Sequence, residues 1–393
     1  MPGLTARADG SGTKATKISR ITKSLWKCFF VTFVFFVAFV PRPSAVQSSQ
    51  AWPQFRGNAR LTGIASADVP ANLSLKWTYE GGESFESSPA VADGVVYAGA
   101  GNGDILAIDL ETGKLRWKRA TGNPIGESSP AVGGGLVYVG DLTGVFHAVR
   151  AADGTPAWTF TTNGEIKSSP VLTGDIVLIG SYDTHLYALD AKTGALRWKL
   201  RINGPVHATP AVVGGTIYFG GCDEQFRAVR VSDGKVLFEV PLGSNTGSSA
   251  VIEGTRAYLG TFDNEVVAVD LQAKRIAWRF RDPDREFPYY ASPALAGTRV
   301  IIGGRDKAVH ALETATGKSA WKFVTRARVD SSAALAGNRV FVGSSDGKLY
   351  VLDAQTGQKT WEYEVGDALT ASPAIAGGRV VIGSLDGRLY CFG

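Results

Sequence analysis

Short apolar strings alternate with glycine-rich polar turns along most of the chain. In the first complete unit the strings cover residues 89–91, 95–98, 105–110 and 115–118, and Gly, Asp and Thr lie between them. Runs of this length, rich in β-branched and aromatic residues and bounded by turn residues, are typical of β-strands. The pattern therefore predicts four short antiparallel strands in about 40 residues.

The same unit recurs along the chain, marked by the string Ser-Ser-Pro-Ala-Val or a relaxed copy of it. The marker positions are Pro89, Pro130, Pro170, Pro210, Ala250, Pro293, Ala333 and Pro373. A Ser or Thr precedes each marker, and glycine follows ten residues later. Eight units of four strands predict an all-β fold, an eight-bladed β-propeller of four-stranded blades.

An aromatic residue stands in the predicted fourth strand of every blade. Because it recurs at one register, we expect it to dock one blade onto the next rather than to bind a ligand. These docking residues are Trp77, Trp117, Trp158, Trp198, Phe238, Trp278, Trp321 and Trp361.

The two ends of the repeat are complementary. The last unit ends at Gly393, 20 residues after Pro373, and so lacks a fourth strand. A matching strand, residues 75–79 around Trp77, stands alone at the other end. We therefore expect the N-terminal strand to close the eighth blade, which removes an exposed sheet edge.

A tight turn precedes each predicted fourth strand. It carries Thr-Gly or Asp-Gly in six units, and these pairs supply the positive φ that such a turn needs. The fifth unit has Lys274 in place of the glycine, so a slightly different turn is predicted there.

The repeat resembles the tryptophan-docking repeat of the pyrroloquinoline-quinone (PQQ) family. The motif reads Ala-Ile-Asp-Leu-Glu-Thr-Gly-Lys-Leu-Arg-Trp over residues 107–117, with a second copy over 188–198 and a relaxed copy over 351–361. The resemblance covers residues 74–393 and implies an eight-bladed propeller. In size and number of units the chain is similar to the propeller scaffold of the outer-membrane β-barrel assembly machinery. The resemblance therefore implies a binding or scaffold function.

The resemblance does not imply that this chain binds the quinone cofactor. Enzymes of the PQQ family have a vicinal Cys-Cys disulfide over the quinone and a calcium ion, whereas this chain has no adjacent cysteines. It also has no Cys-x-x-Cys-His motif for a covalent haem. We expect no cofactor and no catalytic residue, with a PQQ- or metal-dependent oxidoreductase as the alternative.

Charge divides the chain into two parts. Residues 1–45 carry seven cations and one anion, a net +6, which leaves −1 of the total +5 for the rest. This basic stretch precedes an apolar run, residues 28–40, so residues 1–45 read as a signal peptide or an uncleaved N-terminal anchor. Residues 46–73 are expected to form a lead-in. The near-neutral body disfavours nucleic acid as a partner. The basic and apolar leader indicates that the rest of the chain is exported, to the periplasm or out of the cell.

The other reactive residues have structural interpretations. His147 and His310 occupy the position that Tyr187, Tyr350 and Tyr390 hold in other units, and the four histidines show no metal-ligand spacing. The cysteines of the fourth and eighth blades are predicted to be free thiols. The hydroxyl residues before the markers have no recurring His or Asp partner, so they are predicted to be structural.

One segment, residues 281–290, breaks the repeat. It makes the interval from the fifth unit to the sixth 43 residues, three longer than the usual 40, and combines charges with two tyrosines, a composition typical of a binding loop. The alternatives are a long solvated link and a Ca²⁺ site at Asp282, Asp284 and Glu286. The partner-binding candidates are Arg281, Asp282, Asp284, Arg285, Glu286, Tyr289, Tyr290, Arg305, Arg326 and Arg328.

The sequence thus predicts an exported, monomeric, non-catalytic propeller. We expect it to engage a protein or glycan of the cell envelope through one face of the ring. It would touch the membrane only through an uncleaved N-terminal segment. A sensor or scaffold subunit tethered by that segment is the remaining alternative.

Overall fold

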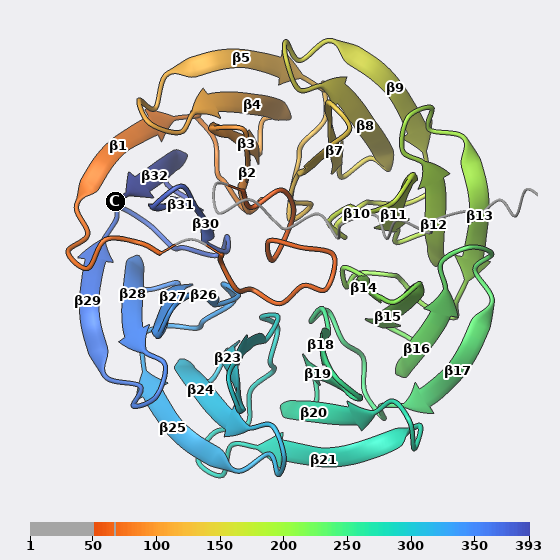
Figure 1. The fold of residues 1–393 in the computed structure, drawn as a ribbon, viewed down its shortest axis with the longest axis vertical. Helices are drawn as coiled ribbons and strands as arrows, with labels where there is room; N and C mark the ends of the chain where they lie inside the picture. Colours follow the sequence, from red (N-terminus) through yellow and green to blue (C-terminus); the bar gives the residue numbers. More distant parts are fainter. Residues whose placement is uncertain (1–50, 67) are drawn as a thin grey trace, which may run out of the picture. The chain divides into compact units, whose positions relative to one another are not determined.

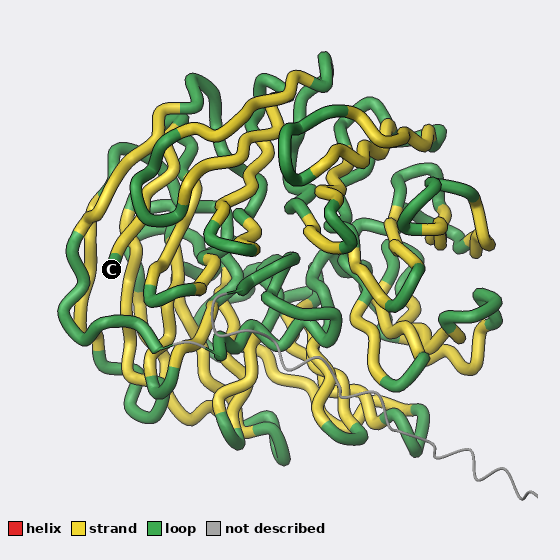
Figure 2. Tube along the Cα trace, turned by 45° about the horizontal axis from the view of Figure 1, so that its top comes forward, coloured by secondary structure: helices red, strands yellow, loops and turns green. Residues whose placement is uncertain are grey.

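The computed structural model describes residues 51–66 and 68–393. Their fold is the predicted eight-bladed β-propeller (Figure 1). Each blade is a sheet of four antiparallel strands, and strands and loops account for the whole described trace (Figure 2). In that part of the chain no helix has the length and hydrophobicity of a membrane span. The predicted signal peptide or anchor, residues 1–45, lies outside the described residues.

The blades follow one another along the chain. Blade 1 consists of β2 (Ala90–Ala92), β3 (Val95–Gly99), β4 (Asp104–Asp109) and β5 (Leu115–Ala120), and blade 2 consists of β6 (Ala131–Gly133), β7 (Leu136–Gly140), β8 (Val145–Arg150) and β9 (Pro156–Thr161). Blade 3 consists of β10 (Val171–Thr173), β11 (Ile176–Gly180), β12 (His185–Asp190) and β13 (Leu196–Arg201), and blade 4 consists of β14 (Ala211–Val213), β15 (Thr216–Gly220), β16 (Gln225–Arg230) and β17 (Val236–Pro241). Blade 5 consists of β18 (Val251–Glu253), β19 (Arg256–Gly260), β20 (Glu265–Asp270) and β21 (Arg275–Arg281), and blade 6 consists of β22 (Ala294–Ala296), β23 (Arg299–Gly304), β24 (Ala308–Glu313) and β25 (Ser319–Val324). Blade 7 consists of β26 (Ala334–Ala336), β27 (Arg339–Gly343), β28 (Lys348–Asp353) and β29 (Lys359–Glu364), and blade 8 consists of β30 (Ala374–Ala376), β31 (Arg379–Gly383), β32 (Arg388–Phe392) and β1 (Leu75–Glu80).

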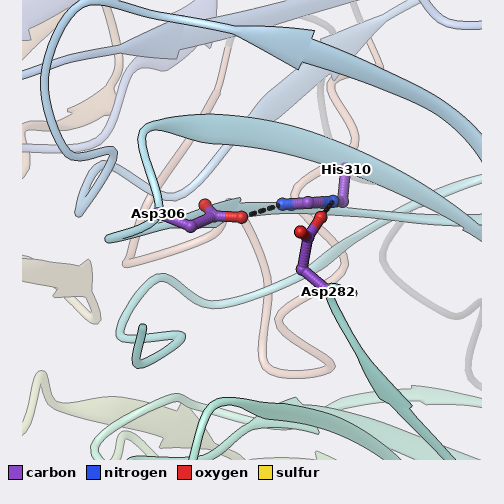
Figure 3. A group of neighbouring side chains, drawn as sticks. All are labelled: Asp282, Asp306 and His310. Carbon is purple, nitrogen blue, oxygen red and sulfur yellow. Dashed lines mark hydrogen bonds and ion pairs between the residues drawn. The ribbon is translucent and has the colours of Figure 1, made fainter. Parts of the chain in front are cut away.

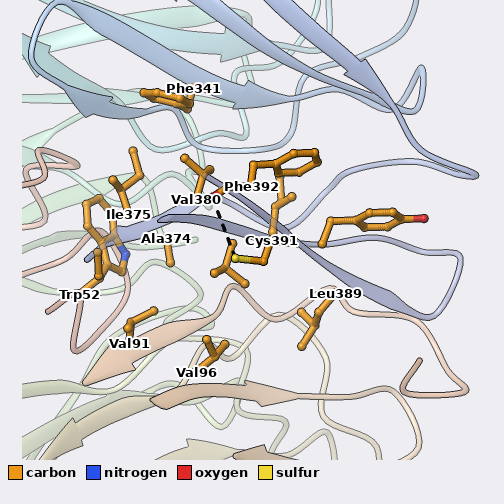
Figure 4. Packing of buried hydrophobic residues seen from close by; sticks show 14 of the residues in the cluster. Trp52, Val91, Val96, Phe341, Ala374, Ile375, Val380, Leu389, Cys391 and Phe392 are labelled. Atoms are coloured by element: carbon orange, nitrogen blue, oxygen red, sulfur yellow. Dashed lines mark hydrogen bonds between the residues drawn. The ribbon is translucent and has the colours of Figure 1, made fainter. Parts of the chain in front are cut away.

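The ring closes as predicted. Strand β1 pairs antiparallel with β32, with Trp77 opposite Cys391 and Tyr79 opposite Leu389. Side chains of blades 7, 8 and 1 share one buried apolar cluster around this junction (Figure 4). The N-terminal strand therefore completes the eighth blade.

The tryptophans dock onto the next blade, as the repeat predicts. The indole N–H of Trp77 donates to the Leu110 carbonyl at 2.8 Å, and that of Trp321 donates to the Ala354 carbonyl at 3.0 Å. The ring lies against the turn glycine of that next blade. A Cβ on Gly113 would stand 2.7 Å from Trp77, and its φ of 70° already disfavours side chains.

The exceptional turn of the fifth blade has a matching exception in the fourth. Lys274 keeps the left-handed conformation, with φ of 52°, and β21 begins at the next residue. The docking residue that faces this turn is Phe238, and the Lys274 ammonium lies 5.5 Å from the centre of its ring. Because Phe is smaller than Trp, the turn has room for a Cβ. The glycine and the tryptophan are therefore coupled requirements of the repeat.

The hydroxyl residues that precede the markers form a closed ring of hydrogen bonds around the axis. Each backbone N–H donates to the hydroxyl oxygen of the next blade at 2.8–3.0 Å, and Ser372 closes the circle by donating to Ser88. The members of this hydroxyl ring are Ser88, Ser129, Ser169, Thr209, Ser249, Ser292, Ser332 and Ser372. Their recurrence follows from this inter-blade bond, which confirms a structural role.

Residues 51–66 pass across the axis below the hydroxyl ring (Figure 1). The first strand of each blade has an open edge there, and an unpaired buried N–H is costly. Backbone oxygens of this lead-in accept from Val91, Val132, Val212, Leu295 and Leu335, while the Gln54 side chain accepts from Leu172. The sequence indicates only a lead-in; the structure shows that it binds six of the eight blades.

A buried arginine fixes the lead-in. Arg56 is 1% exposed, and its guanidinium donates to the carbonyls of Ala333 and Pro293. Burial lowers the pKa of Arg56 to about 9. Gly63 has a φ of 68°, and a Cβ there would lie 2.1 Å from the guanidinium, so a side chain at this position would strain the backbone and displace Arg56. The lead-in thereby closes one face of the ring at its centre.

Candidate functional site

A cavity of about 240 Å³ lies on the axis above the hydroxyl ring. Phe55 of the lead-in reaches it from below, and the residue three positions before each marker lines its wall. This wall register is the variable one of the repeat: Glu86, Glu127, Lys167, His207, Gly247, Tyr290, Asp330 and Thr370. Its side chains differ from blade to blade, whereas the hydroxyls two positions later do not.

Tyr290 reaches across the axis from the end of the inserted segment. Its hydroxyl donates to Glu127 Oε2 at 2.8 Å and lies 2.8 Å from His207 Nε2. The other nitrogen of His207 lies 2.5 Å from the Tyr182 hydroxyl. Residues of blades 2, 3 and 4 thus hold the segment that begins blade 6. This group, Tyr182, His207, Glu127 and Tyr290, is termed the axial latch.

The contacts of the axial latch shift the pKa values of Glu127 and Tyr290. Burial raises the pKa of the Glu127 carboxyl, but hydrogen bonds from His207 and Tyr290 outweigh burial and hold it below its usual range. Burial and the charge of Glu127 raise the pKa of Tyr290 far above its usual range. The Tyr290 hydroxyl therefore stays protonated and remains a donor.

Three cations border the latch. The Arg305 guanidinium lies 4.6 Å above the Tyr290 ring and donates to Asp330 at 2.8 Å, and Arg328 shares the same carboxylate at 3.1 Å. The Lys167 ammonium lies 5.1 Å from the centre of the Tyr182 ring. Arg305 and Arg328, predicted from sequence as neighbours of the inserted segment, are thus brought to it.

The inserted segment divides into buried and exposed residues. Tyr289 is 1% exposed and Asp282 is 3% exposed, so neither side chain lies at the surface, where a partner-binding candidate was expected. Tyr290 belongs to the axial latch rather than to the outer rim. Exposed side chains on this face include Arg281, Asp284, Arg285, Glu286, Arg326 and Arg328.

Sequence reasoning missed Phe287. It is 49% exposed and is the only exposed aromatic residue in the part of the chain that the structure describes. It lies beside Arg285, whose guanidinium donates to the Asp306 carbonyl at 2.8 Å and so fixes the loop to blade 6. An apolar side chain directly after the charged run Asp284–Glu286 of the inserted segment was a signal that could have identified it.

A second group lies beneath the segment (Figure 3). Asp282, Asp306 and His310 are buried, and one ligand atom from each lies within 4.8 Å of the others. His310 Nε2 is 2.7 Å from Asp306 Oδ2, the same contact that Tyr187 makes with Asp183 in blade 3. His310 thus makes the contact that a tyrosine makes at the same position in blade 3, and its contact with Asp282 is additional.

The proposed calcium trio does not converge. The Asp282 carboxylate turns inward and binds the Lys322 ammonium at 2.7 Å, while Asp284 and Glu286 are exposed. Calcium requires about six to eight oxygen ligands around one point. These three residues do not provide that arrangement.

The axial cavity does not fit the quinone of the PQQ family. PQQ is a planar tricarboxylate, and here the Tyr290 side chain crosses the axis to Glu127, with a second carboxylate, Glu86, on the wall. Burial and the charge of Glu127 raise the pKa of Glu86, so the wall at Glu86 and Glu127 disfavours a further carboxylate, whereas Lys167, Arg305 and Arg328 line other parts of the cavity. Cys222 and Cys391 are both free.

Comparison with known proteins shows which family has this architecture. The family model described as outer membrane protein assembly factor BamB matches residues 62–173, 119–255 and 242–393. No curated protein matches the chain. The crystal structure of BamB from Moraxella catarrhalis has a TM-score of 0.70 at 17% identity, covering 82% of this chain and 99% of that one.

Two dehydrogenases share the fold. A europium-containing methanol dehydrogenase has a TM-score of 0.73 at 13% identity, over 88% of this chain and 98% of that one. The quinohemoprotein alcohol dehydrogenase from Comamonas testosteroni has a TM-score of 0.76 at 16% identity, over 87% and 80%. At these identities the likeness shows the fold alone. The family match extends through all eight blades, and the chain belongs to the PQQ-repeat propeller family described as outer membrane protein assembly factor BamB.

Proposed function

We propose that the protein is an exported, non-catalytic scaffold of the cell envelope that binds a protein partner. The binding surface is the face of the ring that carries the inserted segment, residues 281–290. Membership of a family described as an assembly factor supports this function. The observation that carries it is the exposed Phe287, presented by a segment that is fixed at both ends.

The segment is preorganised for binding. At its start Asp282 Oδ1 accepts from the backbone N–H groups of Asp284 and Arg285, and at its end Tyr290 is held by the axial latch. A loop that is ordered before binding loses less conformational entropy on association. Phe287 can therefore act as an anchor without a large ordering cost.

Charge favours a partner with an acidic surface. Arg285 is exposed on the segment itself, and Lys307, Arg326 and Arg328 are exposed on loops of blade 6 and of the link to blade 7. Carboxylates are present as well, because Asp284 and Glu286 lie in the same segment. Arginine and large aromatic residues are the side chains that most often dominate binding energy at interfaces. The expected partner surface is an apolar pocket bordered by Asp and Glu.

Capture from envelope extract tests this function. Central interface anchors cost at least about 2 kcal/mol when truncated, a loss of about 30-fold in affinity. The double variant Phe287→Ala, Arg285→Ala should therefore lose the captured partner. Leu196→Ala is the matched control, because Leu196 is 48% exposed on an outer strand. Equal capture by both variants would place the binding surface elsewhere on the ring.

A further inference from the structure

The buried group beneath the inserted segment arises from two exceptions to the repeat. Asp282 occupies a position that in the other blades holds Gly81, Thr121, Thr162, Ile202, Leu242, Thr325 and Val365. His310 occupies the position of a tyrosine in blades 3, 7 and 8. The two replacements face each other across the junction of blades 5 and 6. A carboxylate and an imidazole thus meet at this junction. In the other blades the position of Asp282 holds a hydroxyl, an aliphatic side chain or glycine.

Hydrogen bonding defines the state of His310. Asp306 Oδ2 accepts from Nε2 at 2.7 Å, which places the proton of a neutral imidazole on Nε2. The Nδ1 lone pair then points toward Asp282 Oδ2 at 3.8 Å. His310 is fully buried, and Nδ1 has no hydrogen-bond partner among the residues that the structure describes. An unpartnered Nδ1 facing a carboxylate oxygen is relieved either by a second proton on the imidazole or by a cation held between the two atoms.

We propose that Asp282 and His310 bind a divalent transition metal ion such as Zn²⁺. Bonds of about 2.0–2.2 Å from zinc to nitrogen and oxygen span separations up to about 4.2 Å, which includes the 3.8 Å between Nδ1 and Oδ2. Asp306 supplies the outer carboxylate that typically orients a metal-binding histidine through its other nitrogen. The imidazole favours zinc, cobalt or nickel over calcium and magnesium.

The surrounding side chains are consistent with an exchangeable cation. The Lys322 ammonium lies 2.7 Å from Asp282 Oδ2 and 3.5 Å from Asp284, and its side chain is a quarter exposed. It neutralises Asp282 in the metal-free protein and turns to Asp284 when the metal binds. The Tyr289 hydroxyl, buried and without a hydrogen-bond partner in the described part of the chain, offers an oxygen beside the group.

The site would fix the start of the inserted segment to blade 6. It is independent of the partner, because its residues are buried beneath the surface that carries Phe287. Failure of metal binding would leave the proposed scaffold function untouched, and failure of partner capture would leave the metal site untouched.

Cobalt and zinc titrations of the untagged full-length protein, freed of metal by chelation, test the proposal. The expected result is one equivalent of Co²⁺ with visible absorption bands, displaced by Zn²⁺. Asp282→Asn and His310→Asn should each weaken binding at least tenfold, while Lys322→Ala, which removes the competing ammonium, should tighten it. The chain has only four histidines, which keeps adventitious binding low.

Blade 2 provides the matched control. His147 contacts Asp141 at 2.9 Å as His310 contacts Asp306, but Thr121 stands in the place of Asp282. His147→Asn should therefore leave cobalt binding unchanged. The proposal is overturned if the folded wild-type protein takes up no Co²⁺ or Zn²⁺, or if Asp282→Asn binds as tightly as wild type. It is also overturned if nitrogen NMR shows His310 protonated on both nitrogens with zinc present.

Discussion

Replacement of Trp77 by alanine tests whether the N-terminal strand is an integral part of the ring. Trp77 is 9% exposed, packs against Gly113 of blade 1 and donates to the Leu110 carbonyl. Truncation of a buried aromatic residue costs about 3–5 kcal/mol, and the carbonyl also loses its donor. That is a large part of the total stability of a typical domain, about 5–15 kcal/mol.

The repeat offers a matched comparison at Trp321. It is also 9% exposed, donates to the Ala354 carbonyl and packs against Gly357, but it belongs to a blade formed from consecutive strands. Urea unfolding of Trp77→Ala and Trp321→Ala should show losses that agree within about 1 kcal/mol. Lys76→Ala, at an exposed neighbour, should stay within about 0.5 kcal/mol of wild type. If Trp77→Ala resembles Lys76→Ala instead, the eighth blade is not closed by β1.

Three further predictions concern the coupled turn, the axial latch and the cofactor. Phe238→Trp should lower the free energy of unfolding by about 1–3 kcal/mol, because the larger ring overpacks against Lys274. Adding Lys274→Gly should restore this stability in a double-mutant cycle, and simple additivity of the two changes would contradict the coupling. Tyr290→Phe should lower the free energy of unfolding most above pH 5, because the hydrogen bond from Tyr290 stabilises the fold only while Glu127 is ionised. The loss of stability should shrink as the pH falls through the lowered pKa of Glu127. Urea midpoints at pH 7 and pH 3 check this, and a pH-independent cost would refute it. PQQ with Ca²⁺ should produce no saturable absorbance change and no dye-linked oxidation of alcohols or sugars; turnover would establish the oxidoreductase alternative.

The fold could be predicted from sequence because its determinants are periodic. The marker, the turn glycine and the docking tryptophan each recur at a fixed spacing, and the missing last strand had one counterpart, around Trp77. The path of the lead-in could not be predicted, since its bonds to the first strands involve backbone groups that leave no side-chain pattern. Arg56 fixes that path through its side chain, but a lone arginine in the segment carries no periodic signal.

The candidate site was predictable only in position. The three extra residues located the inserted segment, and its charges suggested a binding surface. Tyr290 turns inward because it stands in the wall register, three residues before Pro293, and its hydroxyl there meets Glu127 and His207. Which of the other side chains of the segment face outward depends on contacts with neighbouring blades. Asp282 is buried because it occupies a register that is buried in neighbouring blades. Aligned by register, Asp282 is the one carboxylate among glycine, threonine and aliphatic residues, and this anomaly is a signal that the repeat itself carries.

The most direct test of the scaffold function is a hydrogen-exchange footprint of the propeller with its captured partner. Binding through the proposed face should slow exchange in residues 282–290 and 325–330, and leave the lead-in and the hairpins of the opposite face unchanged. Slowed exchange confined to residues 51–66 or to those hairpins would contradict the proposed binding face.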